Sequence, residues 1–396
     1  MHDPQPVAAI ITEYRRHSHA DVIVGKILEG PLYDGENLFP LKLVTAYVDQ
    51  FPKNDMSRDL AKKYGFKLCA SIDEALTLGT GKLAVAGVLD IGEHGDYPTN
   101  AVGQILYPRR RFFEEVCKTF ARTKQTAPVF NDKHLAATWA DAKWMYDRAR
   151  ELGVPLLAGS SVPVTWRKPD LTLPKNAVLT EAVVLGYGPA EGYGFHALEG
   201  LQCMAERRAG GETGVAAVRI VTGEAMWKEC DAGAFSRDLV EETLKHLIAH
   251  AAGDYRKVTA KANDAAVWLI EYRDGFKGAI AVLNGYVHET DNDGGAFIFA
   301  GKLKGAEKPV SCKFFLQQPD PFAHFTQVLR GFEFMVRTNH APYPVERTLL
   351  TTGILDAIMA SYHAKGKRIE TPHLKIAYAP VEWPHGVGEL PKTIKR

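Results

Sequence analysis

About one third of the way along the chain, an apolar segment ends in an acid, a lysine and a histidine. The apolar residues Ala127–Phe130 are followed closely by Asp132, Lys133 and His134. Such a run predicts a buried strand, and in an open α/β sheet the carboxyl ends of strands open onto the ligand crevice. Charged side chains there point at a substrate, and a lysine can transfer a proton. Lys133, with Asp132 beside it, is therefore the first candidate for catalysis.

Other titratable side chains follow other predicted strands. They are His17, His19, Glu93, His94 and Asp96, which join Asp132 and His134. Because the carboxyl ends of parallel strands share one edge of a sheet, we expect these groups to converge on one crevice. His94 is there a further candidate for proton transfer.

A divalent metal ion is one possible occupant of this crevice. Carboxylate oxygens and imidazole nitrogens are ligands that suit Zn²⁺, Mn²⁺ or Fe²⁺. The metal hypothesis uses five side chains, namely His19, Glu93, His94, Asp96 and His134. Each histidine has a simpler alternative, which is a cap or a loop hydrogen bond.

Composition limits the classes of protein and partner. With 396 residues, 46% of them hydrophobic, the chain can bury a large core in two domains of ordinary size. A net charge of +1 gives no global field that favours nucleic acid or an anionic membrane, so a small molecule is the expected partner. Five cysteines without Cys-x-x-Cys spacing indicate reduced thiols and a cytoplasmic location. The stretch Met1–Pro6 shows no signal-peptide pattern, and no run of ~18 apolar residues predicts a membrane span.

Residues 1–160 alternate short apolar runs with helical patterns. The apolar runs predict strands at Val7–Ile11, Leu41–Val48, Phe66–Cys69, Leu83–Leu89, Pro128–Phe130 and Val154–Ala158. The segments between them predict helices at Met56–Tyr64, Ile72–Leu76, Phe112–Phe120 and Ala136–Leu152. This alternation predicts an α/β domain with a Rossmann-like, doubly wound parallel sheet.

Residues 161–396 have a different pattern. Strands are expected at Ala182–Leu185, Ala216–Thr222, Lys257–Lys261, Ala265–Glu271, Gly278–Leu283, Ala296–Lys302 and Val310–Gln317. Most of them follow one another without a helix, which predicts a second α/β domain with a large, mostly antiparallel open sheet. Helices expected at Phe195–Arg207, Ser236–Ala252, Pro321–Thr338 and Val345–His363 would cover one face of it.

Two segments resemble the Gfo/Idh/MocA sugar dehydrogenases, whose two-domain layout also matches nearly the whole chain. The strand end at Asp132–His134 is similar to the Glu-Lys-Pro segment of that family, with histidine in place of proline. The segment Glu191–Glu199 is similar to its Asp-x-Gly-x-His-x-x-Asp segment, with Gly192 in place of the first acid. The resemblance implies that His196 shares acid–base chemistry with Lys133. A helix cap or a packing role is the alternative for His196.

The resemblance also implies a nicotinamide cofactor, NAD or NADP, but the turn after the first strand departs from the pattern. Thr12, Tyr14 and His17 stand where glycines let the backbone approach a pyrophosphate. Arg15 could hold phosphate as a charge partner or belong to a solvated loop. Asp49 is placed either to bind a ribose hydroxyl or to cap a helix. We therefore expect weak or absent NAD(P) binding at Thr12, Tyr14, Arg15 and Asp49.

Three hypotheses follow. The first is an enzyme of Gfo/Idh/MocA type that acts on a sugar-like, polyhydroxylated small molecule, nominally as an oxidoreductase. The second is a metal-dependent lyase, hydrolase or epimerase that has lost nicotinamide binding, since a bound cation can activate water or polarise a carbonyl. The third is a non-catalytic sugar-binding relative, which has little use for so many clustered titratable groups. The resemblance also implies a homo-oligomer.

Overall fold

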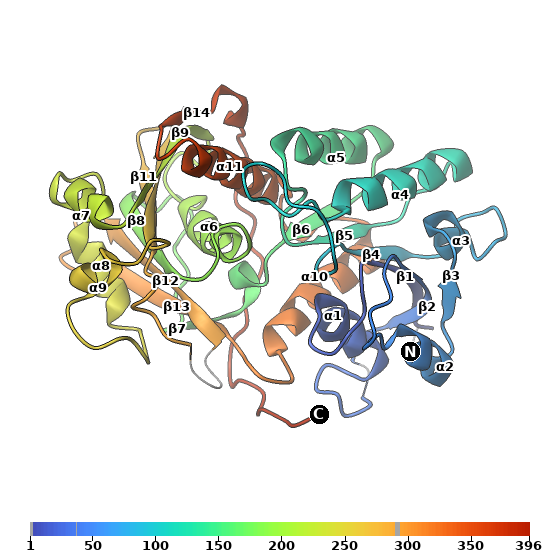
Figure 1. The fold of residues 1–396 in the computed structure, drawn as a ribbon. Helices are drawn as coiled ribbons and strands as arrows, with labels where there is room; N and C mark the ends of the chain where they lie inside the picture. The colour runs from blue at the N-terminus through green and yellow to red at the C-terminus, as the bar shows by residue number, and fades with distance from the viewer. Residues whose placement is uncertain (1–2, 37, 290–293) are drawn as a thin grey trace.

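The computed structural model describes residues 3–36, 38–289 and 294–396, so residues 1–2 of the N-terminal stretch lie outside it. Two sheets lie side by side (Figure 1). The first has six parallel strands in the order β3-β2-β1-β4-β5-β6. They are β1 (Gln5–Ile11), β2 (Leu41–Val48), β3 (Lys67–Cys69), β4 (Gly87–Ile91), β5 (Val129–Asp132) and β6 (Leu156–Gly159). The expected Rossmann-like sheet is confirmed.

Five helices connect these strands. They are α1 (His19–Leu28), α2 (Ser57–Tyr64), α3 (Ile72–Thr77), α4 (Arg109–Thr123) and α5 (Trp139–Leu152). Ser18 caps α1 and Thr138 caps α5, because each hydroxyl accepts a hydrogen bond from an amide in the first turn. The crossovers are those of a doubly wound fold, so the ends of β1, β4 and β5 share one edge.

The second sheet has eight strands in the order β14-β9-β10-β11-β8-β12-β13-β7. Its strands are β7 (Trp166–Lys168), β8 (Leu179–Gly186), β9 (Val215–Thr222), β10 (Ala266–Tyr272), β11 (Lys277–Val282), β12 (Gly294–Leu303), β13 (Val310–Leu316) and β14 (Ile369–Glu370). The pairing is antiparallel except between β11 and β8. The mostly antiparallel sheet is confirmed.

Helices cover both faces of the second sheet, not one as expected. The helices of this half are α6 (Gly192–Ala205), α7 (Glu224–Asp231), α8 (Arg237–Leu244), α9 (Tyr255–Thr259), α10 (Ala323–Thr338) and α11 (Glu346–His363), with 3₁₀ turns η1 (Val162–Val164) and η2 (Pro372–Leu374). Val184 packs with residues of α6 and α11, whereas its neighbours Val183 and Leu185 pack with residues of α7 and α8. The face that was expected to lack helices is therefore also covered within the chain.

Two other expectations for this half are corrected. Lys257–Lys261 is not a strand, because Asp254 caps a helical turn there by accepting a hydrogen bond from the Lys257 amide. The helix expected over Ser236–Ala252 ends at Leu244. None of the helices in the described ranges is long and apolar enough to cross a membrane.

Helix α10 belongs to the second half of the chain but packs on the first sheet. Leu329 and Phe332 of α10 are buried in the same cluster as Ile23 of α1 and Phe130 of β5. In Figure 1 α10 accordingly lies beside α1. Elements from both halves thus surround the carboxyl ends of β1, β4 and β5.

Candidate functional site

A cavity of about 210 Å³ lies where the ends of β1, β4 and β5 meet α6 and α10. Five histidines and one lysine line it, namely His17, His19, His94, Lys133, His196 and His324. Aromatic side chains, among them Tyr193, Phe297 and Phe325, form much of the remaining wall. Pockets for drug-sized ligands measure roughly 300–1,000 Å³. This cavity therefore suits a smaller, polar molecule.

Lys133 lines this cavity and belongs to a buried network of three charged side chains. Its Nζ lies 2.8 Å from Glu93 Oε1, and Arg109 holds Glu93 Oε2 at 2.5 Å. Burial raises the pKa of Glu93, but the positive charges of Lys133 and Arg109 outweigh it and hold that pKa well below its usual range. Glu93 is therefore a carboxylate, and Lys133 faces the cavity as an ammonium group that can donate a proton.

His196 lines the same cavity as Lys133 and belongs to helix α6, which packs on the second sheet. Its Nδ1 lies 2.5 Å from the hydroxyl oxygen of Ser160, which also accepts a hydrogen bond from the Val162 amide. Burial lowers the pKa of His196 well below its usual range, so the ring is neutral at physiological pH. A neutral imidazole held by a hydroxyl can exchange hydrogen bonds with a substrate hydroxyl or accept its proton.

Two more neutral histidines complete the wall. Burial lowers the pKa of His94 to about 3 and that of His324 well below its usual range. His94 Nε2 and His324 Nδ1 are buried without a hydrogen-bond partner among the described residues. An unsatisfied buried polar atom costs about 1–3 kcal/mol. A ligand with hydroxyl groups would relieve this cost, because a hydroxyl both donates and accepts.

Left-handed backbone conformations are concentrated around the cavity. His17, His94, Lys133 and Phe322 have φ values of +58°, +68°, +63° and +47°. Residues other than glycine adopt such values at a cost, and strain of this kind clusters at functional sites. In Lys133 the conformation turns the chain sharply at the end of β5, which places the side chain over the carboxyl edge of the sheet.

His19 and Asp132 form a second polar pair in the same wall. His19 is the first residue of α1 and Asp132 the last of β5, and Nδ1 of the one lies 2.5 Å from Oδ2 of the other. The Asp132 side chain is 4% exposed, whereas that of His19 is 14% exposed towards the cavity. Asp132, predicted as catalytic, thus contacts His19 and does not itself line the cavity.

The five-ligand metal hypothesis does not hold for the described residues, because its groups do not converge. Asp96 is exposed, and His134 lies on the other side of Lys133, against Arg109 and Phe195. The left-handed turn at Lys133 separates the two side chains that flank it. Of the remaining predicted ligands, His19 and His94 have their rings 5.3 Å apart, but Glu93 is bound by two cations. No group of three His, Cys, Asp or Glu side chains in the described ranges could hold a metal ion.

The turn between β1 and α1 does not fit the pyrophosphate of a dinucleotide. Tyr14 is 1% exposed and fills the inside of the turn. The amides that would face a phosphate already have partners, since His17 N–H donates to Asp21 and Arg15 N–H donates to Ser18. Asp21 also places a carboxylate in the first turn of α1, where a phosphate would need positive charge.

The other predicted cofactor contacts also have partners within the protein. Thr12 is fully buried and donates to the Glu93 carbonyl, and Arg15 pairs with Glu13. The Asp49 carboxylate accepts hydrogen bonds from Tyr47, Tyr97 and Arg111.

These contacts occupy three of the four acceptor positions of the Asp49 carboxylate. Burial raises the pKa of Asp49, but the hydrogen bond from Arg111 and those of the two tyrosines outweigh burial and lower it. The carboxylate joins β2 to α4 and to the loop after β4, and one acceptor position remains on Oδ1, so the ribose role stays a prediction.

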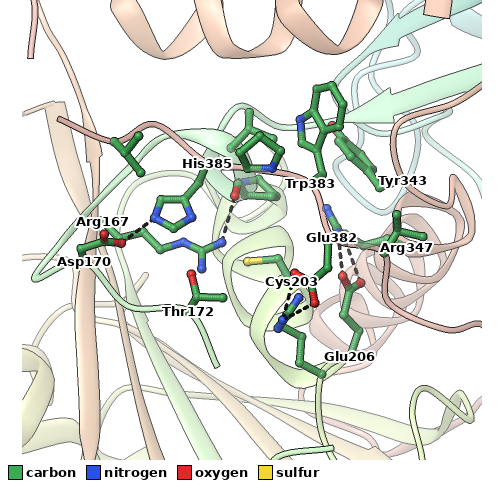
Figure 2. A pocket seen from close by; sticks show the side chains of 16 residues that line it. Arg167, Asp170, Thr172, Cys203, Glu206, Tyr343, Arg347, Glu382, Trp383 and His385 are labelled. Atoms are coloured by element: carbon green, nitrogen blue, oxygen red, sulfur yellow. Dashed lines mark hydrogen bonds and ion pairs between the residues drawn. The ribbon is translucent and has the colours of Figure 1, made fainter. Parts of the chain in front are cut away.

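A larger cavity of about 420 Å³ lies elsewhere, between η1, the end of α6 and the C-terminal segment (Figure 2). Three arginines and three acids line it, with the pairs Arg347–Glu206 and Arg207–Glu382, while Arg167 donates to backbone carbonyls. His385 contacts Asp170, and burial lowers the pKa of His385, so it adds no charge. Positive and negative charges balance there, so the cavity has no excess charge to attract an ion. Its groups join the C-terminal segment to the second sheet, and the smaller cavity remains the candidate site.

Ser160 and His324 were not found from the sequence, and Arg109 was expected in a solvent-facing rim or turn rather than in a buried network. Ser160 directly follows β6, so the same strand-end rule that selected Lys133 could have selected it. Arg109 stands in a basic run that is typical of an exposed surface, yet it is fully buried. His324 comes from α10, more than 180 residues beyond Lys133, and no local pattern links the two.

Solved structures share this fold over nearly the whole chain. GenD2 from gentamicin A biosynthesis, solved in complex with NAD, is 15% identical, with a TM-score of 0.56 over 93% of this chain and 97% of that chain. The scyllo-inositol dehydrogenase of Lactobacillus casei is 10% identical, with a TM-score of 0.56 over 93% and 99%. The myo-inositol dehydrogenase of Corynebacterium glutamicum is 12% identical, with a TM-score of 0.53 over 92% and 98%.

These likenesses confirm the fold that the resemblance implied, and at such low identity they show the fold alone. No protein-family model and no curated protein matches the chain. Evidence about function therefore comes from the residues of the site.

Proposed function

We propose that this chain is an enzyme of the Gfo/Idh/MocA type that acts on a sugar-like, polyhydroxylated small molecule by acid–base chemistry at Lys133 and His196. The observation that carries the proposal is the meeting of these two groups in one small cavity, each held by its own partner. Lys133 supplies a proton held next to Glu93, and the neutral ring of His196 exchanges a proton with a substrate hydroxyl.

The surroundings of the two groups support this substrate class. The cavity is too small for a large ligand, and its wall contains polar ring nitrogens that need partners. Two of the structural neighbours act on inositols, as their names state. A cyclic polyol, or the ketone formed from one, matches the size and the hydrogen-bonding groups of the cavity.

The proposal does not include the nicotinamide cofactor that oxidoreductases of this type use. GenD2 was solved with NAD, but the turn at Tyr14 and Asp21 of this chain does not fit a pyrophosphate in the usual place. We therefore propose no reaction step that uses a nicotinamide. The term oxidoreductase describes here the type of enzyme that the chain resembles, not the reaction that it catalyses.

A turnover screen tests the proposal. Purified protein would be incubated with inositols, hexoses and their monoketones, with and without NAD or NADP, and the products followed by NMR. We expect turnover of at least one compound, reduced about 10²-fold or more by Lys133→Ala and by His196→Asn. Lys143→Ala is the matched control, because Lys143 pairs with Asp147 on the exposed face of α5. A wild-type protein that changes no compound, or a Lys133→Ala variant that turns over normally, would refute the proposal.

A further inference from the structure

The pair formed by His19 and Asp132 has the geometry of a histidine prepared to act as a base. A carboxylate oxygen can only accept hydrogen bonds, so the short Nδ1–Oδ2 contact of 2.5 Å places the ring proton on Nδ1. In a neutral ring this leaves Nε2 without a proton. Asp132 thereby fixes the basic tautomer of His19 in the way that the carboxylate of a catalytic triad fixes its histidine.

The ring of His19 is also held in place on both sides. Its centroid lies 5.3 Å from the ring of His94 and 5.1 Å from that of Phe325, both with edge-to-face geometry. His19 Nε2 has no hydrogen-bond partner in the described part of the chain, and the residue lines the cavity. The basic nitrogen is therefore free to meet a ligand.

Carboxylate–histidine pairs also orient metal ligands, and the charges of the site decide between the two roles. A cation bound at His19 would share the cavity with the ammonium group of Lys133. Asp132 is the one carboxylate in contact with His19, and the buried carboxylate of Glu93 is already held by Lys133 and Arg109. The surroundings of His19 thus favour proton transfer over metal binding.

We propose that His19, oriented by Asp132, is the general base of a redox-neutral reaction in this cavity, with Lys133 as the general acid, on a sugar-like compound that carries a hydroxyl group next to a carbonyl. This inference rests on the proposed function and specifies its reaction: His196 bonds a substrate hydroxyl, as proposed above, whereas His19 takes the proton from carbon. It needs no oxidant, which agrees with a β1–α1 turn that does not fit a dinucleotide.

The reaction interconverts the carbonyl compound and its enediol. His19 Nε2 takes the proton from the carbon between the hydroxyl and the carbonyl, and the electrons of that C–H bond form a C=C bond. The electrons of the C=O π bond take the proton of Lys133, which gives the enediol. His19 then returns its proton to one carbon of the C=C bond. The hydroxyl group on the other carbon gives its proton to Lys133, which regenerates a carbonyl. The net result is isomerisation or epimerisation.

Deuterium exchange tests the inference without a cofactor. The probe is the monoketone of scyllo-inositol, incubated with the protein in D₂O, and NMR follows the loss of the C–H signal next to the carbonyl. We expect exchange by the wild type and a reduction of about 10²-fold or more in His19→Gln and Asp132→Asn. Added imidazole should restore exchange to His19→Ala, which would also show that this variant folds. His246→Asn is the control, because His246 bonds Ser311 far from the cavity.

The outcomes separate this inference from the proposed function. If Lys133→Ala loses exchange while His19→Gln and Asp132→Asn exchange normally, the base is another group, and the inference fails while the proposed function stands. If the wild type turns over polyols only with NAD(P) and exchanges nothing without it, the inference fails in the same way. Exchange that is abolished by a chelator and restored by Zn²⁺ would identify His19 as a metal ligand and overturn the inference.

Discussion

Replacing Glu93 by glutamine removes the one negative charge that two buried cations share. Arg109 is fully buried and Lys133 is 8% exposed, and their nitrogens lie 2.5 Å and 2.8 Å from the two carboxylate oxygens. Glutamine has nearly the same shape, so the substitution changes charge and not volume. Removal of one partner from a buried ion pair costs about 3–5 kcal/mol, and Arg109 cannot escape by losing its proton.

We therefore expect Glu93→Gln to lower the free energy of unfolding by about 4 kcal/mol, a large part of the ~5–15 kcal/mol that stabilises a typical domain. Urea unfolding followed by circular dichroism measures the change. Lys133→Met should cost less, because Glu93 keeps Arg109 as its partner.

The double variant isolates the ion pair. In Glu93→Gln/Lys133→Met one of the two unpaired cations is gone, so the total loss should be smaller than the sum of the single losses by about 1–3 kcal/mol. The reasoning is refuted if Glu93→Gln unfolds at the wild-type midpoint, or if the losses simply add.

Three further predictions concern the cofactor turn, a buried acid and the backbone of the site. Calorimetry should show little heat with millimolar NAD or NADP, and tight stoichiometric binding would contradict the fit argued for Tyr14 and Asp21. Burial raises the pKa of Glu199 from 4.5 to about 7, so the stability from its bound proton is present below pH 4.5 and lost as the pH rises through 7. Glu199→Gln should lack this loss of about 3 kcal/mol in pH-dependent unfolding, and equal pH profiles would contradict it. Lys133→Gly should be more stable than Lys133→Ala by about 1 kcal/mol in urea, because φ is +63° there; the opposite order would exclude strain at this residue.

The sequence was most informative where one local pattern has one structural solution. The strands β1 and β8 were predictable because apolar runs are bounded by turns. Helix α1 was not predicted, and its sequence explains why. Its residues Val22–Val24 are β-branched and apolar, a pattern typical of strands, and nearly the whole helix is buried. It is helical because it packs between the first sheet and α10, which no local pattern shows.

The site was predictable only as far as the strand ends define it. The rule that side chains after parallel strands meet at one edge correctly brought His19, His94 and Lys133 to one cavity. It failed for Asp96 and His134, because the direction of a side chain depends on backbone angles that the rule does not contain. His94 and Lys133 both have positive φ, so the residues after them leave the cavity.

The cavity and the turn between β1 and α1 differ in how their backbone and side chains are held, and this difference bears on the chemistry of the site. Around the cavity, four residues other than glycine keep left-handed backbone angles, a strain of about 1–3 kcal/mol each. Strain persists only where the surrounding packing holds it, and His94 and Lys133, two of these residues, line the cavity. At the turn between β1 and α1, by contrast, the Tyr14 ring fills the interior and Asp21 accepts a hydrogen bond from the His17 amide, while the buried Tyr14 hydroxyl has no partner among the described residues. This contrast between the cavity and the filled turn supports the proposed proton transfer over hydride transfer from a nicotinamide.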